Sequence, residues 1–539
     1  MRQDLFELVH TVHQKARNLD DEDQHLLNML LRGFERNGLS LPSGPQRDRF
    51  GEITKTLFRL KAAFQGNKAL SSGTYVWFTL SELEGVPDQE ISQMHKGSGE
   101  YEGMFGLTDR DLDSIPIVKT AQQSGTRRRA YVAKNNRFDS NISVMRDVIA
   151  LRDEAARLLG YQNHAEFRLE DRMAKTPKAV NDFLHHIQDG LASHGMNEVE
   201  KLKELKREHV ESRGESFDGH FWLWDEAFYK SIMAKKQHSI DQNKIKEYFS
   251  LETTLEGTME IFQRIFGLDF EELKDHGDVW HKDVRAFMVW DEEDRGGDFL
   301  GYLYLDLFTR EGKYSTPFNS PIEPGFIKSD GSRLFPSTAL ICNFSKPSPE
   351  RPTLLQHQEL VTLIHEFGHA VHDVTSKTKY ARFHGPMGVT VDFGEAPSQL
   401  LEQWTWTPSV LKKISRHYSS ISSEYLALWR KEARDNAEPP RHMPDEMINN
   451  LIASNSTNKG LHCLHQIFLC TYDLAIYQPE SREVAEQMNI TKLWNEIRER
   501  IYPIDGPEVE GLGHEWGHGQ TNFGHVISEY DAGYYSYLL

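Results

Sequence analysis

The sequence contains little cysteine and no long apolar run. Its three cysteines, Cys342, Cys463 and Cys470, are an odd number spread over 539 residues, which argues against a disulfide framework. No uninterrupted apolar stretch approaches the roughly 18 residues that a membrane-spanning helix needs. The N-terminal segment MRQDLFELVH lacks the apolar core of a secretory leader. We therefore expect a cytoplasmic protein without membrane segments.

Basic residues are also in the minority. Lys and Arg number 62 against 81 Asp and Glu, which gives a formal net charge of −19. Because no basic stripe and no nucleic-acid-binding motif is present, nucleic acid is not an expected partner. Hydrophobic residues make up 38% of a chain that is longer than one typical domain, which is enough for two lobes. We expect a monomer.

The segment LVTLIHEFGHAVHDV at 360–374 carries the strongest functional pattern. His365 and His369 stand four residues apart, with Glu366 beside the first. Residues four apart share a face of an α-helix, so both imidazoles can reach one metal ion and Glu366 can address a water there. This is the H-E-x-x-H arrangement of zinc peptidases, and the apolar residues around it recur at helical spacing. Gly368 weakens such a helix by about 1 kcal/mol relative to alanine, which is tolerable if another element packs closely there.

The same five-residue pattern occurs a second time, from His514 to His518. Without a helix, a spacing of four no longer places two histidines on one face. Repeated glycine is poor helix material, and glycines occupy positions 511, 513, 517 and 519. We interpret the second copy as a glycine-rich loop.

A catalytic zinc site usually has three protein ligands and one water. A metzincin would continue the motif with a glycine and a third histidine, and both are missing here. Glu395, in DFGEAPSQLLEQW, is a stronger candidate, because the intervening chain allows the first helix to end and a second helix to pack back. Glu395, Gln399 and Glu402 would share a face of that second helix. Gln399 or Asp392 could orient a ligand by a hydrogen bond.

These residues resemble the M3 metallopeptidases, the group of thimet oligopeptidase, neurolysin and the saccharolysin-like enzymes. HEFGH followed by DFGEAPSQLLEQW carries the resemblance. Relative to the family pattern, the chain is short at both termini. Further segments agree in order along essentially the whole chain: LEDRMAK at 169–175, LWDEAFY at 223–229, GYLYLDLFTREGKY at 301–314, ALICNFSKP at 339–347 and FGHVISEYDAGYYSYL at 523–538.

The resemblance implies one zinc ion per chain. His365, His369 and Glu395 fall where the family places its zinc ligands, and Glu366 falls at the position of its general base. Such a base takes a proton from the attacking water and later delivers it to the leaving amine.

The resemblance also implies roles for the aromatic segment near the C-terminus. His525 and Tyr530 fall where the family stabilises the tetrahedral intermediate, and Tyr534 and Tyr537 fall where it binds the substrate. Between His525 and Tyr530 the chain reads VISE, where animal members carry a glycine pair. We therefore expect a stiffer loop before Tyr530.

Helical patterns dominate the chain, and strand patterns cluster from 284 to 345. VRAFMVW and FLGYLYLDLF, separated by DEEDRGGD, predict a hairpin, and AVNDFLHHIQDGLASHG at 179–195 predicts a helix that ends at its glycine. With the resemblance, we expect a mainly α, two-lobed, zincin-type fold with a small antiparallel sheet lining a deep central cleft. Residues 1–300 would form a mainly helical lobe, and residues 301–539 the zinc-bearing catalytic lobe.

The expected activity is that of a zinc-dependent endopeptidase acting on internal bonds of short peptides. The restriction to short peptides is implied by the resemblance, because the family encloses its site in a deep channel. General peptide turnover and maturation of a precursor peptide fit equally well. Two alternatives are a catalytically weakened peptide-binding relative and a zinc exopeptidase specific for a peptide terminus.

Overall fold

The computed structural model is mainly helical. It describes residues 2–69, 73–108, 111–237, 241–274, 279–292, 294, 296–313, 316–433, 437–528 and 530–539. The segments named from the sequence include five residues that lie outside these ranges: Met1, Glu293, Arg295, Tyr314 and Glu529. Helices account for 57% of the structure, accompanied by small sheets, so the expected mainly α class is confirmed.

Contacts between elements divide the chain into two compact units. Unit 1 comprises Met1–Gln237 and Asn458–Leu539, and unit 2 comprises His238–Thr457. This division differs from the expected boundary after residue 300, because the strands that precede residue 300 pair with strands that follow it. The segment 458–539 belongs to unit 1 because its helices contribute apolar side chains to the same core as the N-terminal helices.

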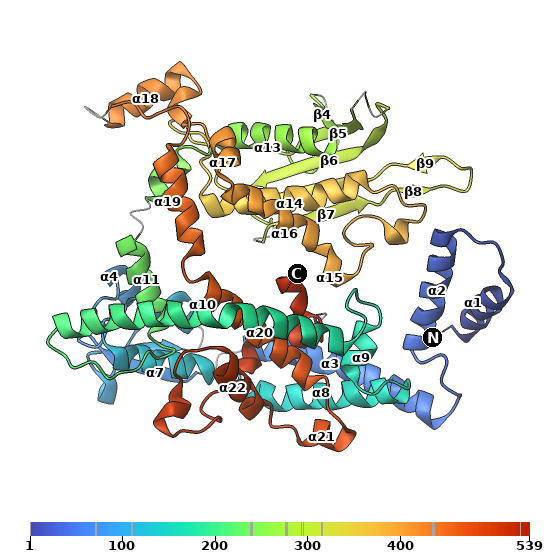
Figure 1. Ribbon diagram of the computed structural model, residues 1–539, viewed down its shortest axis with the longest axis horizontal. Coiled ribbons are helices and arrows are strands. Elements are labelled where there is room, and N and C mark those ends of the chain that lie inside the picture. The colour runs from blue at the N-terminus through green and yellow to red at the C-terminus, as the bar shows by residue number, and fades with distance from the viewer. Residues whose placement is uncertain are drawn as a thin grey trace. The chain divides into compact units, whose positions relative to one another are not determined.

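Unit 1 is built mainly of helices (Figure 1). Most of its buried apolar residues form one large cluster, and a smaller cluster lies at its three-stranded sheet. Within this unit, the helices α10 and α20 pack side by side. Its helices are α1 (Gln3–Lys15), α2 (Asp21–Arg36), α3 (Pro45–Ala69), α4 (Asp88–Ile91), α5 (Asp111–Ser114), α6 (Ile117–Thr120), α7 (Ser124–Asn135), α8 (Ser140–Leu158), α9 (His164–Leu169), α10 (Pro177–Ser212), α11 (Glu226–Gln237), α20 (Lys459–Ile476), α21 (Arg482–Gln487) and α22 (Ile490–Ile501). A three-stranded sheet, ordered β1-β3-β2, contains β1 (Tyr75–Thr79), β2 (His95–Lys96) and β3 (Met104–Thr108).

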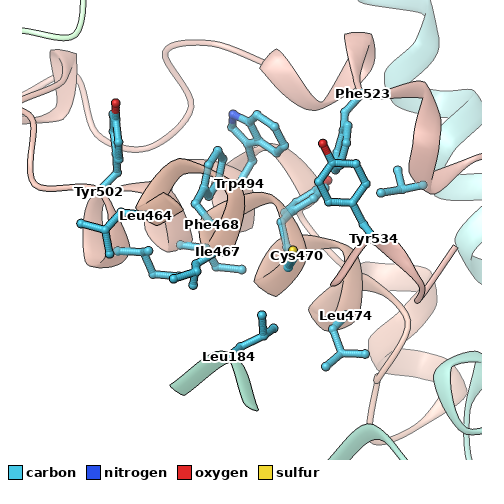
Figure 2. Packing of buried hydrophobic residues seen from close by; sticks show 14 of the residues in the cluster. Leu184, Leu464, Ile467, Phe468, Cys470, Leu474, Trp494, Tyr502, Phe523 and Tyr534 are labelled. Atoms are coloured by element: carbon cyan, nitrogen blue, oxygen red, sulfur yellow. The ribbon is translucent and has the colours of Figure 1, made fainter. Parts of the chain in front are cut away.

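Helix α10 begins at Pro177, two residues before the segment predicted from the sequence, and does not end at Gly195. Thr176 caps it by accepting a hydrogen bond from the Ala179 N–H, and Pro177 occupies the first turn. The helix then continues through Gly195 to Ser212, so the predicted end at Gly195 is wrong. A Cβ atom at Gly195 would lie 2.3 Å from Cδ1 of Leu464, so the glycine serves close packing rather than capping. Figure 2 shows Leu464 in the apolar layer of α20 that this contact completes.

Unit 2 is organised around a five-stranded sheet with the order β4-β5-β6-β10-β7. The predicted hairpin is confirmed, because β5 pairs antiparallel with β6. The strands of unit 2 are β4 (Leu268–Glu272), β5 (Arg285–Asp291), β6 (Phe299–Phe308), β7 (Phe318–Glu323), β8 (Phe326–Ile327), β9 (Arg333–Leu334) and β10 (Ser337–Phe344). Its helices are α12 (Gln242–Lys246), α13 (Leu251–Phe266), α14 (His357–Thr375), α15 (Val391–Gly394), α16 (Ala396–Glu402), α17 (Pro408–Ile414), α18 (Ser423–Ala433) and α19 (Asp445–Ser456).

The five-stranded sheet is mixed rather than antiparallel, which corrects the sequence prediction. Strand β10 pairs parallel with β6 on one side and antiparallel with β7 on the other. The reason is the path of the chain: β7 runs back against the direction of β6, and β10 then starts from the same end as β6 and inserts between the two strands. Such a pairing between distant segments leaves no local signal in the sequence.

Helix α14 lies along this sheet, and α16 packs on the helix (Figure 1). The first turn of α14 carries a capping box. The Gln356 side chain accepts a hydrogen bond from the Glu359 backbone N–H, and the Glu359 side chain accepts one from the Gln356 backbone N–H. The buried face of α14 includes Leu363, Ile364 and Phe367, which pack into the same core as the strands. The sheet therefore fixes the direction in which the opposite face of α14 points.

Cys342, Cys463 and Cys470 are all unpaired, as expected. Among the helices that the structure describes, none combines the length and hydropathy needed to cross a lipid bilayer.

A buried ion cluster links β6 to β10. Asp306 on β6 accepts hydrogen bonds from Lys313 Nζ at 2.9 Å and from Arg310 Nη1 at 2.6 Å. Lys313 Nζ also donates to the Cys342 carbonyl oxygen on β10, at 2.5 Å. Burial alone would raise the pKa of Asp306, but the hydrogen bonds, chiefly from Arg310, hold it well below its usual range.

Replacing Asp306 by asparagine should destabilise the protein, because it leaves the buried Lys313 cation without its counter-charge. We expect the free energy of unfolding to fall by about 3–5 kcal/mol at pH 7, measured by denaturant unfolding. The carboxylate's contribution is complete above its ordinary pKa of 3.8 and shrinks as the pH falls below that value. Glu311→Gln, at an exposed position nearby, is the matched control and should change little. Equal stabilities for the Asp306 variant and the wild type would refute this account.

Candidate metal centre

Helix α14 places the two motif histidines side by side. His365 and His369 are one turn apart on the same face, and their Nε2 atoms are 3.2 Å apart. Because the neighbouring face of the helix is held in the sheet core, the two rings have little freedom to separate. The sequence prediction that both imidazoles can address one point is consistent with this geometry.

Glu395 completes a triangle with the two histidines. It stands at the junction of α15 and α16, and its Oε2 lies 3.3 Å from His365 Nε2 and 3.2 Å from His369 Nε2. Close packing makes this approach possible, because a Cβ at Gly368 would lie only 3.1 Å from the Cα of Ser398 on α16. The helix-weakening glycine of the motif is therefore explained by the element that carries Glu395.

The triangle has the dimensions of a tetrahedral metal site. In a tetrahedron with bonds of 2.0–2.1 Å, as zinc makes to nitrogen and oxygen, ligand atoms lie about 3.3–3.4 Å apart. The three edges here measure 3.2, 3.3 and 3.2 Å. Among the described residues, this is the one group of His, Cys, Asp or Glu side chains close enough together to hold a metal ion. Two nitrogens and one carboxylate oxygen also form a donor set that zinc prefers.

The charges at the triangle favour a cation. Burial alone would lower the pKa of His365, but hydrogen bonds with Glu395 and Glu402 raise it to about 10. Hydrogen bonds with His365 and His369 hold the pKa of Glu395 well below its usual range. Both shifts mean that positive charge is stabilised at the centre of the triangle, where a metal cation would replace the protons.

Glu402 contacts the ring nitrogen of His365 that points away from the triangle, and this contact was not predicted. Its Oε1 lies 2.7 Å from His365 Nδ1. When Nδ1–H donates this bond, the lone pair of Nε2 faces the other two ligand atoms, as metal binding requires. Among the described residues, the Gln399 side chain makes no such hydrogen bond, and Asp392 is buried. The spacing of seven from Glu395 to Glu402 was a signal in the sequence that could have identified this residue.

Replacing Glu402 by glutamine should weaken metal binding by about 10–100-fold, because His365 loses its anionic partner. Competition with a chromophoric zinc chelator measures this affinity. Gln399→Ala, on the same helix, is the matched control and should bind zinc as the wild type does. A Glu402 variant with the affinity of the control would show that the contact does not orient His365.

Glu366 is a buried carboxylate beside the triangle. Burial raises its pKa, against the opposing influence of His365, His369 and the Asn319 backbone N–H on β7. A carboxylate with a raised pKa is a stronger base than an exposed one. The arrangement can therefore accept a proton next to a metal site.

The second H-E-x-x-H copy forms a loop, so the interpretation from its glycines is confirmed. Gly511 and Gly513 have φ angles of +86° and +65°. His514 Nε2 bonds the Glu499 carboxylate at 2.7 Å, away from any metal cluster among the described residues. Asn495 Nδ2 organises the loop by donating to the carbonyl oxygens of His514 and Gly517, each at 2.8 Å.

The four residues of the predicted substrate segment gather in one aromatic cluster of unit 1. The His525 ring lies 5.8 Å from Tyr530, 5.3 Å from Tyr534 and 6.1 Å from Tyr537. Tyr534 is buried and packs edge-on against Phe523, as Figure 2 shows, whereas Tyr530 is half-buried. The metal ligands, in contrast, belong to unit 2.

Comparison with known proteins assigns the chain to a family. The family described as peptidase family M3 matches residues 117–539. Oligopeptidase PhomG of Diaporthe leptostromiformis is 37% identical over 100% of this chain and 77% of its own length. Saccharolysin of Saccharomyces cerevisiae is 33% identical over 100% of this chain and 73% of its own length. The structure of PZ peptidase A covers 100% of this chain and 79% of its own, at 16% identity and a TM-score of 0.40, which adds nothing to the sequence similarity. The protein therefore belongs to peptidase family M3.

Proposed function

We propose that this M3 peptidase is a zinc-dependent endopeptidase that cleaves internal bonds of short peptides. The observation that carries the proposal is the His365–His369–Glu395 triangle, whose edges fit tetrahedral zinc. We assign these three residues as the ligands of one zinc ion per chain. The names of the relatives, which include an oligopeptidase, support short peptides as substrates.

Zinc held by these residues supplies Lewis-acid chemistry, which activates a water and polarises a peptide carbonyl. Glu366 accepts the proton of the attacking water and delivers it to the leaving amine. Burial raises its pKa, which makes Glu366 a stronger base than an exposed glutamate and so favours uptake of the water proton. Glu402 keeps the Nδ1 proton of His365 in place throughout.

The aromatic cluster supplies the groups proposed to meet the substrate. The Tyr530 hydroxyl and the His525 N–H can each donate a hydrogen bond to the oxyanion that forms as the carbonyl is attacked. Tyr534 and Tyr537 would bind the peptide chain with their rings. Tyr530 and Tyr537, with ring centroids 5.2 Å apart, present neighbouring phenols for these tasks.

One ten-residue peptide tests the proposal. The peptide should be cut at internal bonds in the presence of zinc, and its products identified by mass. A version with an acetylated N-terminus and an amidated C-terminus is the matched control, and it should be cut at the same bonds. Release of single terminal residues would instead indicate an exopeptidase, and zinc binding without turnover would indicate a peptide-binding relative.

A further inference from the structure

The segment that carries Tyr530 has almost no regular structure of its own. It lies between two short 3-10 helices, Gly524–Val526 and Tyr534–Leu538, and its described residues form turns. A loop of this kind does not hold a side chain in one place by its own backbone hydrogen bonds. The position of Tyr530 therefore depends on what holds the chain on either side of it.

Arg152 on α8 holds the chain before Tyr530. Its Nη1 donates to the Val526 carbonyl oxygen at 2.7 Å, and its Nη2 donates to those of Ile527 at 2.9 Å and Ser528 at 3.2 Å. The Tyr477 hydroxyl, also bonded to Arg152, donates to the Val526 oxygen at 2.6 Å. The guanidinium is buried, and its fork of donors suits three consecutive carbonyls in a way that a lysine would not.

Asp473 on α20 holds the chain after Tyr530. One carboxylate oxygen accepts the Ala532 N–H at 2.9 Å, and the other accepts the Tyr534 N–H at 3.0 Å. Ala532 has a φ of +51°, in the left-handed region that residues with a Cβ rarely adopt. The two hydrogen bonds to Asp473 help to hold the chain in this strained conformation.

The residue directly after Tyr530 is fixed as well. Asp531 is buried, and its Oδ2 lies 2.6 Å from His164 Nε2 while its Oδ1 lies 3.1 Å from Arg168 Nη2. Arg152 reaches the same carboxylate at 3.5 Å. The chain around Tyr530 is thus bonded to α8, to α9 and to α20, all within unit 1.

We propose that Arg152 and Asp473 are positioning residues, which hold the backbone on both sides of Tyr530 and thereby fix its hydroxyl for its proposed role. The inference rests on the proposed role of Tyr530. Neither residue touches the substrate, and each acts through the backbone of the segment. Catalysis is sensitive to such support, because a misplacement of about 1 Å can cost about a hundredfold in rate.

Asp473→Asn is the most direct variant, because asparagine keeps the shape but directs an NH2 group at one of the two backbone N–H donors. We expect kcat for a quenched short peptide to fall roughly ten- to a hundredfold, with a smaller change in KM. Tyr530→Phe should lower kcat by about 10²–10³-fold. In the double variant, Asp473→Asn should add almost nothing to Tyr530→Phe, because the hydroxyl that Asp473 positions is already gone.

Leu464→Ala is the matched control, since Leu464 is buried on the same helix and faces α10. It should lower thermal stability without lowering kcat. If Tyr530→Phe retains the wild-type kcat, the proposed role of Tyr530 is wrong and the inference falls with it. If Tyr530→Phe is slow but Asp473→Asn is not, or if the two effects multiply, the inference is wrong and the proposed function stands.

Hydrogen exchange of the wild type provides a test that does not depend on the folding of any variant. The amide hydrogens of Ala532 and Tyr534 should exchange as slowly as those of α20. Rapid exchange at both positions would overturn the inference. If Asp473→Asn does not fold, Arg152→Lys can take its place, because it removes the guanidinium fork but keeps the charge. Arg152→Lys should also lower kcat, and a wild-type kcat for Arg152→Lys would overturn the inference.

Discussion

Replacing Glu366 by glutamine should slow hydrolysis of a short peptide by about 10²–10⁴-fold, the range typical for a positioned acid–base group. Glutamine has nearly the same shape as glutamate but accepts no proton at neutral pH. Because Glu366 lies beside the ligand triangle and is not part of it, bound zinc should be retained. The loss should therefore appear in kcat, measured with an internally quenched peptide.

Glu359→Gln is the control for this variant. Glu359 lies on the same helix, and a glutamine there can keep the bond of the capping box. This control should bind zinc and cleave peptide as the wild type does. Undiminished hydrolysis by the Glu366 variant would remove Glu366 from the mechanism.

Replacing Glu395 by glutamine should lower the zinc affinity more than any replacement of a residue that only supports a ligand. The variant loses the only anionic ligand, so zinc affinity should fall by more than the roughly 100-fold that marks the upper end for supporting residues. Hydrolysis should fall with it and return only in part at high zinc. The expected order of affinity loss is Glu395→Gln, then Glu402→Gln, then Gln399→Ala.

The pH dependence of zinc binding has a definite sign. Hydrogen bonds with Glu395 and Glu402 raise the pKa of His365 to about 10, so this residue must release a proton to bind a metal, and the apparent zinc affinity should weaken as the pH falls. Equilibrium dialysis at several pH values measures this affinity.

A Glu395→Gln variant that binds zinc as tightly as the wild type would show that the third ligand is a different residue.

The sequence carries local signals for the group of His365, His369 and Glu395. His365 and His369 share a helical face by spacing alone, and the glycines around His514 were enough to set the second copy apart as a loop. Glu395 required one further step, the assumption that a second helix packs back on the first. Gly368 is where that packing occurs.

Features that depend on distant segments were not predictable in the same way. The parallel pairing of β10 with β6 depends on the route of the chain through β7, and the division into units depends on which helices share a core. Gly195 illustrates the limit at a single residue, because a glycine that ends a helix and one that admits a neighbouring helix have the same sequence signature. The sequence also does not distinguish Glu402 from Gln399 as the partner of His365. The packing of α16 against α14 decides that Glu402 contacts His365.

The most direct test of the account is the metal content of the purified chain. After equilibration with zinc and removal of loosely bound ions, mass spectrometry of the dissolved metal should give one zinc per chain. Anomalous scattering from crystals should place that ion between the side chains of His365, His369 and Glu395. A chain that remains free of metal, or an ion bound by other residues, would contradict it.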